Sequence, residues 1–346
     1  MREVAIIRGD GIGPEISEAT QRVLQAGGAA LRWQEVILGQ EAKRRWGSEL
    51  PAESVERIRR IGVALKAPLI AEPRSGGLWV EGHGERRRYP SVNNGLRREL
   101  GAYANLRPVL GFPGVSGRFQ NLNIVLVREL TEDTYAGIER QPEEGRAEAV
   151  KIVTREATER IARFACEYAV RHGRKKITAV HKANVLHLTD GLFLESVRSV
   201  VARYPDLTFD DRMVDAACYL MVKEPSLFDV LVLPNQYGDI LSDLAAGLVG
   251  SLGLVPGVNI GPGVALFEAA HGAAPDIAGK GVANPIALIL SGALLLEHLG
   301  HTEAAARIRR AVTRVLAAGR CLTPDLGGRS STRELTDAIC AEIESA

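Results

Sequence analysis

Short apolar runs alternate with longer amphipathic stretches along the whole chain. Four runs rich in β-branched residues predict buried strands: Val4–Ile7, Ile124–Val127, Ile177–Val180 and Val230–Leu233. Apolar residues at helical spacing predict four helices: Pro14–Gln25, Thr154–His172, Gly191–Arg203 and Glu303–Ala318. Strands that alternate with helices are typical of an α/β protein with a largely buried sheet.

Two apolar stretches raise the question of a membrane span. Leu244–Phe267 is uncharged but contains six glycines and two prolines, so we expect a packed helix followed by a loop. Ile286–Leu296 is too short to cross a bilayer and is expected to be a buried helix. The amino terminus becomes charged again after four apolar residues, which is too short an apolar region for a signal peptide.

The segment Glu72–Pro90 is the least regular part of the chain. Four glycines surround Trp79, and the segment ends in three consecutive arginines, Arg86–Arg88. We expect a long loop, and loops of this length without regular structure are usually functional or disordered. The residues leave open whether this loop has a function or is a surface excursion.

Composition narrows the class of protein. The 346 residues correspond to one large domain or two of ordinary size. Because 43 Lys and Arg balance 42 Asp and Glu, a net charge of +1 disfavours a nucleic-acid partner and favours a small molecule. The four cysteines form no CxxC motif, which argues against a zinc site or a disulfide scaffold and fits a cytoplasmic location.

A glycine-rich turn, Gly9–Pro14, lies between the first predicted strand and the first predicted helix. It does not match the dinucleotide-binding pattern G-x-G-x-x-G, because the required glycine positions hold Pro14 and Ile16. The turn therefore predicts only a tight change of chain direction.

Two carboxylates follow the strand Val230–Leu233. Asp239 and Asp243 are four residues apart at the start of a predicted helix, so they project from the same face and repel each other. A cation relieves such repulsion, and hard carboxylate oxygens without nearby Cys or His suit Mg²⁺ or Mn²⁺. From this segment alone, one capping and one solvated aspartate is an equally good interpretation.

Other side chains suggest chemistry only in combination. Lys182 directly follows a strand, where a lysine can transfer protons, although spacing alone favours a surface lysine. Three arginines each lie beside an apolar segment: Arg97, Arg107 and Arg128. If they converged on one pocket they would indicate a polyacid substrate, but convergence is not visible in a sequence. Asp276 and Ile277 have the chemistry to hold a ribose and pack on a base, yet an ordinary turn is the preferred interpretation.

Six segments in order resemble the motifs of the β-hydroxyacid oxidative decarboxylases, the family of isocitrate, homoisocitrate and isopropylmalate dehydrogenases: residues 9–15, 103–108, 128–131, 181–184, 238–243 and 271–276. The resemblance covers nearly the whole chain. It implies a non-Rossmann α/β fold with two domains flanking a cleft. The large cofactor-binding domain is expected at 1–100 plus 249–346, and the small domain with the dimer interface at 101–248.

The resemblance also implies a homodimer, in which each active site takes Lys182 and Asp215 from the neighbouring protomer. By the resemblance, Lys182 helps remove the proton of the substrate hydroxyl during oxidation, the metal stabilises the enolate as CO₂ is lost, and Tyr135 donates a proton to the resulting enol. The implied substrate ligands are Ser91, Asn93, Arg97, Arg107, Arg128 and Asn184. The implied metal ligands for Mg²⁺ or Mn²⁺ are Asp215, Asp239 and Asp243. The implied NAD ligands are Lys66, Glu268, His271, Gly272, Asp276, Ile277 and Asn284.

The substrate within the family is predicted from Ser91 and Asn93, which resemble the polar residues that bind the γ-carboxylate of isocitrate. We therefore expect NAD-dependent oxidation of isocitrate. Homoisocitrate, isopropylmalate and a phosphonate analogue such as phosphonomethylmalate remain alternatives, and so does a non-catalytic regulatory role. One departure from the family pattern, Ile70, replaces a hydroxyl expected near the nicotinamide.

Overall fold

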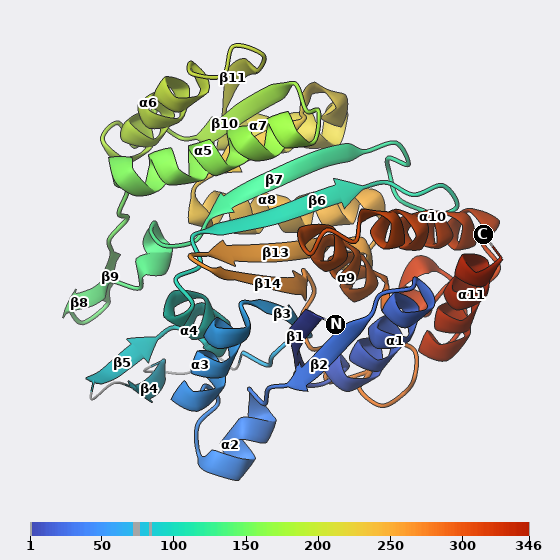
Figure 1. The fold of residues 1–346 in the computed structure, drawn as a ribbon. Coiled ribbons are helices and arrows are strands. Elements are labelled where there is room, and N and C mark those ends of the chain that lie inside the picture. Colours follow the sequence, from blue (N-terminus) through green and yellow to red (C-terminus); the bar gives the residue numbers. More distant parts are fainter. Residues whose placement is uncertain (1, 72–76, 83–84, 346) are drawn as a thin grey trace. The chain divides into compact units, whose positions relative to one another are not determined.

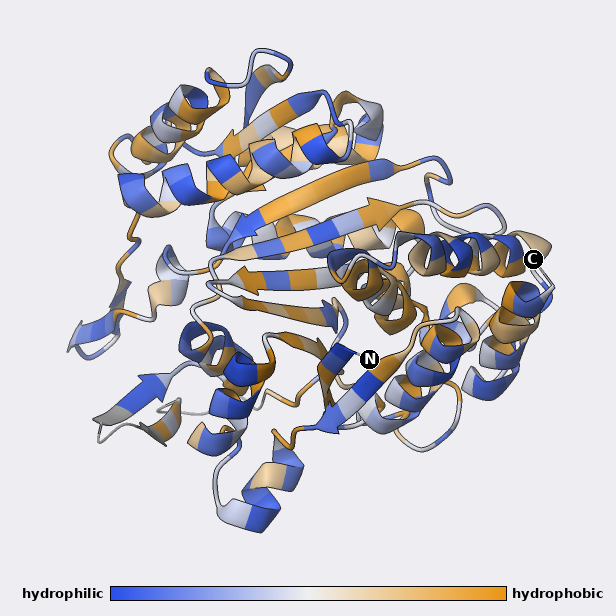
Figure 2. Cartoon of the chain, viewed as in Figure 1, coloured by the Kyte–Doolittle hydropathy of each residue, from blue (hydrophilic) through white to orange (hydrophobic). Residues whose placement is uncertain are grey.

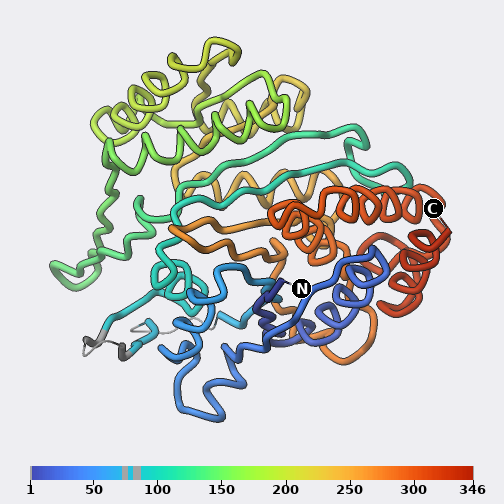
Figure 3. Tube along the Cα trace, in the orientation of Figure 1, coloured from blue at the N-terminus to red at the C-terminus, as the bar shows by residue number. Residues whose placement is uncertain are grey.

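The computed structural model describes residues 2–71, 77–82 and 85–345, which form two compact units (Figure 1). Unit 1 comprises residues 1–101, 110–121 and 246–346, and unit 2 comprises residues 102–109 and 122–245. Both ends of the chain therefore belong to unit 1, and the path between them can be followed in Figure 3. The domain boundaries expected from the sequence stay a prediction.

Unit 1 is built on a sheet with the strand order β13-β14-β3-β1-β2. Its strands are β1 (Arg2–Ile7), β2 (Leu31–Glu35), β3 (Val63–Lys66), β13 (Pro256–Gly261) and β14 (Val264–Ala269). The pairs β2–β1, β1–β3 and β3–β14 are parallel, whereas β13 and β14 are antiparallel. Every residue of β3 and β14 is buried, including Lys66 and Glu268 near the ends of otherwise apolar runs.

Helices cover the sheet of unit 1, and the most apolar one is α9 (Ile286–His298). It is hydrophobic around its whole circumference (Figure 2) and packs against β13, β14, α1 and α10, which confirms the predicted buried helix. Across the described ranges, no helix is long and apolar enough to cross a membrane. The other helices are α1 (Gly13–Ala26), α2 (Gln40–Trp46), α3 (Ala52–Ile61), α4 (Val92–Glu99), α10 (Thr302–Ala318) and α11 (Thr332–Glu344), with 3₁₀ turns η3 (Leu252–Leu254) and η4 (Pro324–Leu326).

Unit 2 contains the strand order β11-β10-β12-β7-β6. Its strands are β6 (Ala104–Leu110), β7 (Asn123–Glu129), β10 (Lys176–His181), β11 (Thr208–Met213) and β12 (Val230–Leu233). The pairs β11–β10, β10–β12 and β12–β7 are parallel, so their carboxyl ends lie at one edge. The helices are α5 (Arg155–Arg171), α6 (Thr189–Val201), α7 (Val214–Lys223) and α8 (Asn235–Val249), with 3₁₀ turns η1 (Thr134–Ala136) and η2 (Pro225–Leu227) and an exposed hairpin of β8 (Glu139–Glu143) and β9 (Arg146–Ala149).

All predicted strands and helices are present, with ends within two residues of those expected. Two predicted loops are wrong. Residues 256–269 form the antiparallel pair β13–β14 rather than a loop, because Pro262 and Gly263 make a two-residue turn with Gly263 at φ 70°. The glycine and proline signals in this stretch thus mark a hairpin.

The loop predicted at Glu72–Pro90 is the second one that the structure contradicts. Residues 72–76 and 83–84 of this segment lie outside the described residues. The described part forms an antiparallel pair, β4 (Leu78–Gly82) and β5 (Glu85–Tyr89). Leu78 and Val80 are buried whereas Trp79 between them is half exposed, which is the period of two expected for a strand. Glycines at both ends of this short alternating segment concealed it.

The tight turn predicted at Gly9–Pro14 is confirmed. Gly9 and Gly11 have φ angles of 69° and 59°, and the N–H of Ile12 donates to the carbonyl of Ala273 at 2.9 Å. A Cβ on Gly11 would lie 2.0 Å from that carbonyl oxygen, so the turn admits only glycine there. The turn therefore holds the backbone at Ala273, within the segment predicted to bind the cofactor.

Replacing Gly11 by alanine is expected to lower the free energy of unfolding by about 3 kcal/mol or more, because it adds backbone strain and a clash with Ala273. Gly28→Ala is the matched control, since Gly28 also has a positive φ of 84° but nothing within 4 Å of the added Cβ. The control should cost about 1 kcal/mol. Equal losses for the two variants in urea unfolding would contradict this account of the turn.

Candidate functional site

The start of α8 is organised around the buried side chain of Arg128. Residue Leu233 at the end of β12 pairs with Arg128 at the end of β7, which brings the guanidinium over the first turn of α8. Asn235 Oδ1 accepts from Arg128 Nε at 3.0 Å and from Nη2 at 2.8 Å, and Nη1 forms an ion pair with Asp239. A Cβ on Gly238 would lie 2.5 Å from the Arg128 stem, so glycine is required beneath it.

A second arginine meets the second aspartate of the predicted metal pair. Arg107 Nη1 lies 3.2 Å from Asp243 Oδ1 and donates to Ser242 Oγ at 2.6 Å, while its Nε donates to Asn105 Oδ1 at 2.9 Å. Burial raises the pKa of Asp243. The negative charge of Asp239 raises it further, whereas Arg107 lowers it. The two arginines thus supply part of the charge compensation that the sequence pattern assigned to a cation.

The carboxylates of Asp239 and Asp243 nonetheless fit a hard divalent cation. Their side chains are 42% and 59% exposed, so oxygen lone pairs remain accessible beside the arginines. No group of three His, Cys, Asp or Glu side chains suited to a metal occurs among residues 2–71, 77–82 and 85–345. The third ligand expected from the sequence, Asp215, is predicted to come from a neighbouring protomer, and this assignment stays a prediction.

Tyr135 lies in the same group of residues. Its hydroxyl donates to Asp239 Oδ2 at 2.7 Å, and the guanidinium carbon of Arg128 lies 5.1 Å from the centre of its ring. Burial and the hydrogen bond to Asp239 raise the pKa of Tyr135 to about 12, so the phenol is protonated at neutral pH. The structure therefore brings together Arg128, Tyr135 and Asp239, which the sequence predicted separately.

Lys182 and Asp215 form a second group at the ends of β10 and β11. The register pairs His181 with Met213, so the turn after β10 lies beside the first turn of α7, and Lys182 Nζ lies 2.6 Å from Asp215 Oδ1. This hydrogen bond lowers the pKa of the exposed Asp215. Asn184, predicted to bind substrate, is exposed in the turn that follows Lys182.

In unit 1 the predicted substrate residue Arg97 meets two predicted cofactor residues. Glu268 Oε1 accepts from Arg97 at 2.8 Å and from Asn259 Nδ2 at 2.7 Å, and its Oε2 accepts from Lys66 Nζ at 2.6 Å. Burial opposes ionisation of Glu268, but Lys66 and Arg97 together outweigh burial and hold its pKa well below its usual range. Glu268 is therefore a buried anion with three donors.

Ser91 and Asn93 lie at the start of α4. Ser91 Oγ caps the helix by accepting from the N–H of Asn94 at 3.2 Å, which leaves the hydroxyl proton available to a carboxylate. Asn93 Nδ2 is 3.5 Å from the carbonyl of Leu69, and its Oδ1 is buried without a hydrogen-bond partner. Both side chains thus retain polar atoms that a ligand can use.

The predicted nucleotide-binding turn contains one similarly unpartnered atom. His271 Nε2 is buried without a hydrogen bond, and burial lowers the pKa of this imidazole. Gly272 and Asp276 are exposed and Ile277 is half-buried. Asn284 plays a structural part, because its Nδ2 donates to Asp325 at 3.0 Å and its Oδ1 accepts from the N–H of Ile286 at the start of α9.

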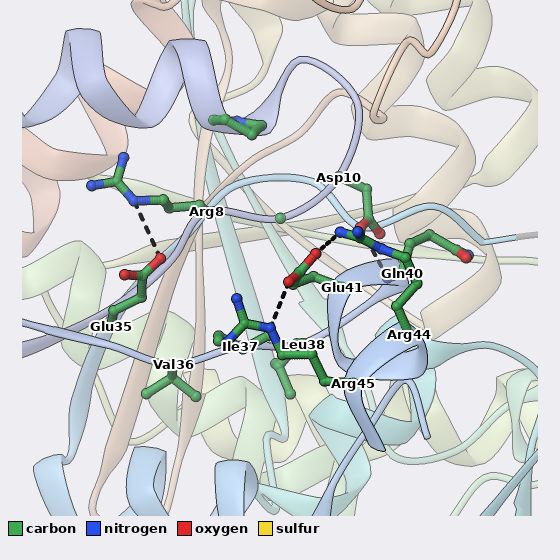
Figure 4. Close-up of a pocket in the computed structure, with 12 residues that line it drawn as sticks. Arg8, Asp10, Glu35, Val36, Ile37, Leu38, Gln40, Glu41, Arg44 and Arg45 are labelled. Atoms are coloured by element: carbon green, nitrogen blue, oxygen red, sulfur yellow. Dashed lines mark hydrogen bonds and ion pairs between the residues drawn. The ribbon is translucent and has the colours of Figure 1, made fainter. Parts of the chain in front are cut away.

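A cavity of about 320 Å³ lies elsewhere in unit 1, beside the ends of β1 and β2 (Figure 4). Most of its charged side chains are paired with one another, as Arg8 with Glu35 at 3.4 Å and Arg45 with Glu41 at 2.5 Å, whereas Asp10 accepts from the backbone N–H groups of Gln40 and Ile70. None of the predicted substrate, metal or cofactor residues lines it.

Comparison with known proteins identifies the family. Residues 3–339 match the family described as isocitrate/isopropylmalate dehydrogenase. The chain belongs to this family. It is 48% identical to the isocitrate dehydrogenase [NAD] catalytic subunit 5, mitochondrial, of Arabidopsis thaliana, over 97% of this chain and 87% of the relative. It is also 46% identical to a regulatory subunit of the mitochondrial NAD isocitrate dehydrogenase of Dictyostelium discoideum, over 99% of this chain and 92% of that relative.

Among solved structures, isocitrate dehydrogenase from Methylococcus capsulatus superposes with a TM-score of 0.92 at 47% identity, covering 99% of this chain and all of that one. The family and the isocitrate/isopropylmalate dehydrogenase-like α/β fold predicted from the motifs are thereby confirmed. The expectation of a cytoplasmic location is wrong, because the relatives named above from both organisms are mitochondrial proteins. The cysteine pattern on which it rested reports a reducing environment and not a compartment.

Several members of the candidate site were missed from the sequence, although Gly238 and Ser242 lie inside a family motif. Asn235, Gly238 and Ser242 all occur in the segment that contains Asp239, yet none was given a role. Asn259, which donates to Glu268, lies in a stretch predicted to be a loop. A strand there would have placed Asn259 beside Glu268, because the antiparallel register sets Asn259 opposite Leu266, two residues from Glu268.

Glu268→Gln is expected to lower the free energy of unfolding at pH 7 by about 3–5 kcal/mol, because Lys66 is left buried without its counter-ion. The folded pKa of Glu268 is depressed, so its stabilisation is complete above the ordinary value of 4.5 and is lost as pH falls below it. The difference in free energy of unfolding between the wild type and the variant, measured in urea, should therefore become smaller below pH 4.5. Glu342→Gln, which breaks an exposed ion pair with Arg314, should cost no more than about 0.5 kcal/mol. A difference that stays constant with pH would count against this ionic role.

Proposed function

We propose that this chain is a catalytic NAD-dependent isocitrate dehydrogenase that converts isocitrate and NAD⁺ to 2-oxoglutarate, CO₂ and NADH. The observation that carries the proposal is the contact of Tyr135 and Arg128 with the same carboxylate, Asp239. The predictions of a decarboxylating dehydrogenase that uses NAD and a divalent metal are supported by relatives named as NAD isocitrate dehydrogenase subunits.

The proposed roles follow from the chemistry of each side chain. Arg97, Arg107 and Arg128 bind the substrate carboxylates, because a guanidinium donates to a carboxylate in two parallel hydrogen bonds. Ser91 donates its hydroxyl proton to the γ-carboxylate, and Asn93 donates the Nδ2 hydrogen that does not point to Leu69. Asn184 is a further substrate ligand. These assignments favour isocitrate over isopropylmalate, because an isopropyl group would leave the polar side chains unsatisfied.

Proton transfer is assigned to two side chains. Lys182 removes the proton of the substrate hydroxyl as the hydride leaves for NAD⁺, and Tyr135 protonates the enol carbon after CO₂ has left. A bound Mg²⁺ or Mn²⁺, held by Asp239, Asp243 and the Asp215 of a neighbouring protomer, supplies Lewis-acid polarisation of the substrate oxygens. We further propose a homodimer with shared active sites, in which Lys182 and Asp215, paired with each other at 2.6 Å, both serve the site of the neighbouring protomer.

The dinucleotide is assigned to residues of unit 1. The exposed carboxylate of Asp276 accepts from the 2′-hydroxyl of the adenosine ribose and repels a 2′-phosphate, which favours NAD⁺ over NADP⁺. Ile277 packs on the adenine, and the unpartnered Nε2 of His271 binds a polar group of the nucleotide. Lys66, Glu268, Gly272 and Asn284 complete the proposed cofactor site.

The substrate assignment is tested by steady-state kinetics of the purified chain with NAD⁺ and Mn²⁺. We expect kcat/KM to rank isocitrate first, homoisocitrate second, and isopropylmalate at least about 100-fold lower, because buried polar groups reject the apolar analogue. Phosphonomethylmalate completes the panel. Arg87 and Arg88 of β5 lie just before Ser91 and Asn93 in the chain, and added guanidinium groups would favour its more negative γ-substituent. If isopropylmalate ranks first, the assignment of Ser91 and Asn93 is wrong; if no substrate is oxidised by the chain alone, its role is regulatory.

Asp239→Asn is expected to lower kcat/KM by about three orders of magnitude or more, because it removes a metal ligand and the acceptor of Tyr135. The variant should be less stable than the wild type, because the buried Arg128 loses a counter-ion, but it should remain folded, since Arg128 keeps both hydrogen bonds to Asn235. Asp337→Asn is the matched control. The Asp337 side chain is 47% exposed, close to the 42% of Asp239, and is also paired with an arginine, Arg22, so this variant should retain full activity. Excess EDTA should abolish the wild-type activity; full activity in EDTA refutes the metal assignment.

A further inference from the structure

A buried carboxylate of unit 2, Asp190, supports the turn that carries Lys182 and belongs to none of the family motifs described above. Its side chain is 0% exposed. Asp190 Oδ2 accepts from the backbone N–H of Lys182 at 2.6 Å and from the Tyr237 hydroxyl at 3.1 Å. Lys151 Nζ lies 2.7 Å from the other oxygen, Oδ1, as an ion pair. Asp190 is thus surrounded by one cation and two neutral donors.

The hydrogen bond from Lys182 determines the geometry of a short turn. The N–H groups of Val185 and Leu186 both donate to the carbonyl of Lys182, at 3.0 and 2.9 Å. The next N–H, that of Ala183, donates to His181 Nδ1 at 3.1 Å. The backbone of Lys182 is therefore held on both sides, and the acceptor of its own N–H is the charged carboxylate of Asp190.

Lys151 extends this support to the turn that carries Tyr135. The Lys151 side chain is 12% exposed, and its ammonium lies 3.5 Å from Asp133 Oδ1 and 4.4 Å from the centre of the Tyr237 ring. Asp133 in turn accepts from the N–H of Thr134 at 2.8 Å and from that of Gln236 at 2.9 Å. One lysine thus contacts the two carboxylates that organise the turns before Tyr135 and after Lys182.

The charge of Lys151 is needed because Asp190 is fully buried. A buried carboxylate that loses its counter-ion is strongly destabilised and recruits other donors or water. Either response would disturb the hydrogen bond from Lys182, since this bond ends on the same carboxylate. A shift of about 1 Å in a catalytic group can slow a reaction about 100-fold.

We propose that Lys151, through its ion pair with Asp190, is a positioning residue that holds the turn carrying Lys182 and links it to the turn carrying Tyr135. The proposal rests on the proposed function for the roles of Lys182 and Tyr135. The contacts among Lys151, Asp190 and Lys182 are independent of it.

The test compares Lys151→Met with Lys151→Arg. Methionine has a similar length but no charge, so kcat should fall about 10- to 100-fold while KM for isocitrate stays within about twofold. Arginine retains the charge and should keep kcat within about threefold of the wild type. Lys176→Met is the matched control, because it breaks another lysine–aspartate pair of unit 2, Lys176 with Asp210 at 2.8 Å, and should leave kcat within about twofold.

Amide hydrogen exchange on the substrate-free protein supplies a readout that does not depend on turnover. Lys151→Met should accelerate exchange at residues 182–186 and in the turn carrying Tyr135 but leave α5 protected, because only these two turns lose their support. If the chain turns over none of the substrates, the proposed function fails and the exchange result still decides the positioning role.

Three outcomes would overturn the proposal: an unchanged kcat in Lys151→Met, an equal loss in Lys151→Arg, or exchange accelerated evenly over unit 2. If Lys151→Met does not fold, Tyr237→Phe replaces it, because it removes only one hydrogen bond to Asp190. We expect this variant to lower kcat about three- to tenfold with faster exchange at residues 182–186. Unchanged kcat and exchange in Tyr237→Phe would overturn the proposal as well.

Discussion

The buried guanidinium of Arg128 is the constraint around which unit 2 is arranged. With its side chain only 2% exposed, the cation has lost its water and must be surrounded by acceptors. Those acceptors are Asn235 and Asp239 on α8, and the ring of Tyr135 covers one face of the group. The residues proposed for metal binding and proton donation are therefore placed by the same contacts that stabilise a buried charge.

In unit 1 a buried negative charge, that of Glu268, likewise holds candidate binding residues in place. The carboxylate of Glu268 is buried, and its three donors come from β3, α4 and β13. Lys66 and Arg97 are thus held in place by Glu268, although they were predicted for different ligands. In both units the candidate binding residues also stabilise the fold, so a loss of activity in their variants has to be separated from a loss of stability.

The sequence predicted the regular elements well where the apolar pattern is long. The strands β1, β7, β10 and β12 and the helix α9 were recognised because each is a continuous apolar run that only burial explains. The hairpins β4–β5 and β13–β14 were missed. All four strands are short, β13 is rich in glycine and β5 is rich in charged residues, and such segments become strands only when a neighbour pairs with them.

By itself, the sequence determined the family, the main elements and the chemical type of each candidate residue, because these depend on local pattern and on ordered motifs. The tertiary structure alone decided which side chains meet. Arg128 and Asp239 are 111 residues apart and are joined because β7 and β12 are adjacent in the sheet. Lys151 and Asp190 likewise meet only after folding, in a region that no motif marks. Pairings of this kind depend on strand order and on the cost of leaving a buried charge alone, and neither is encoded in the spacing of residues along the chain.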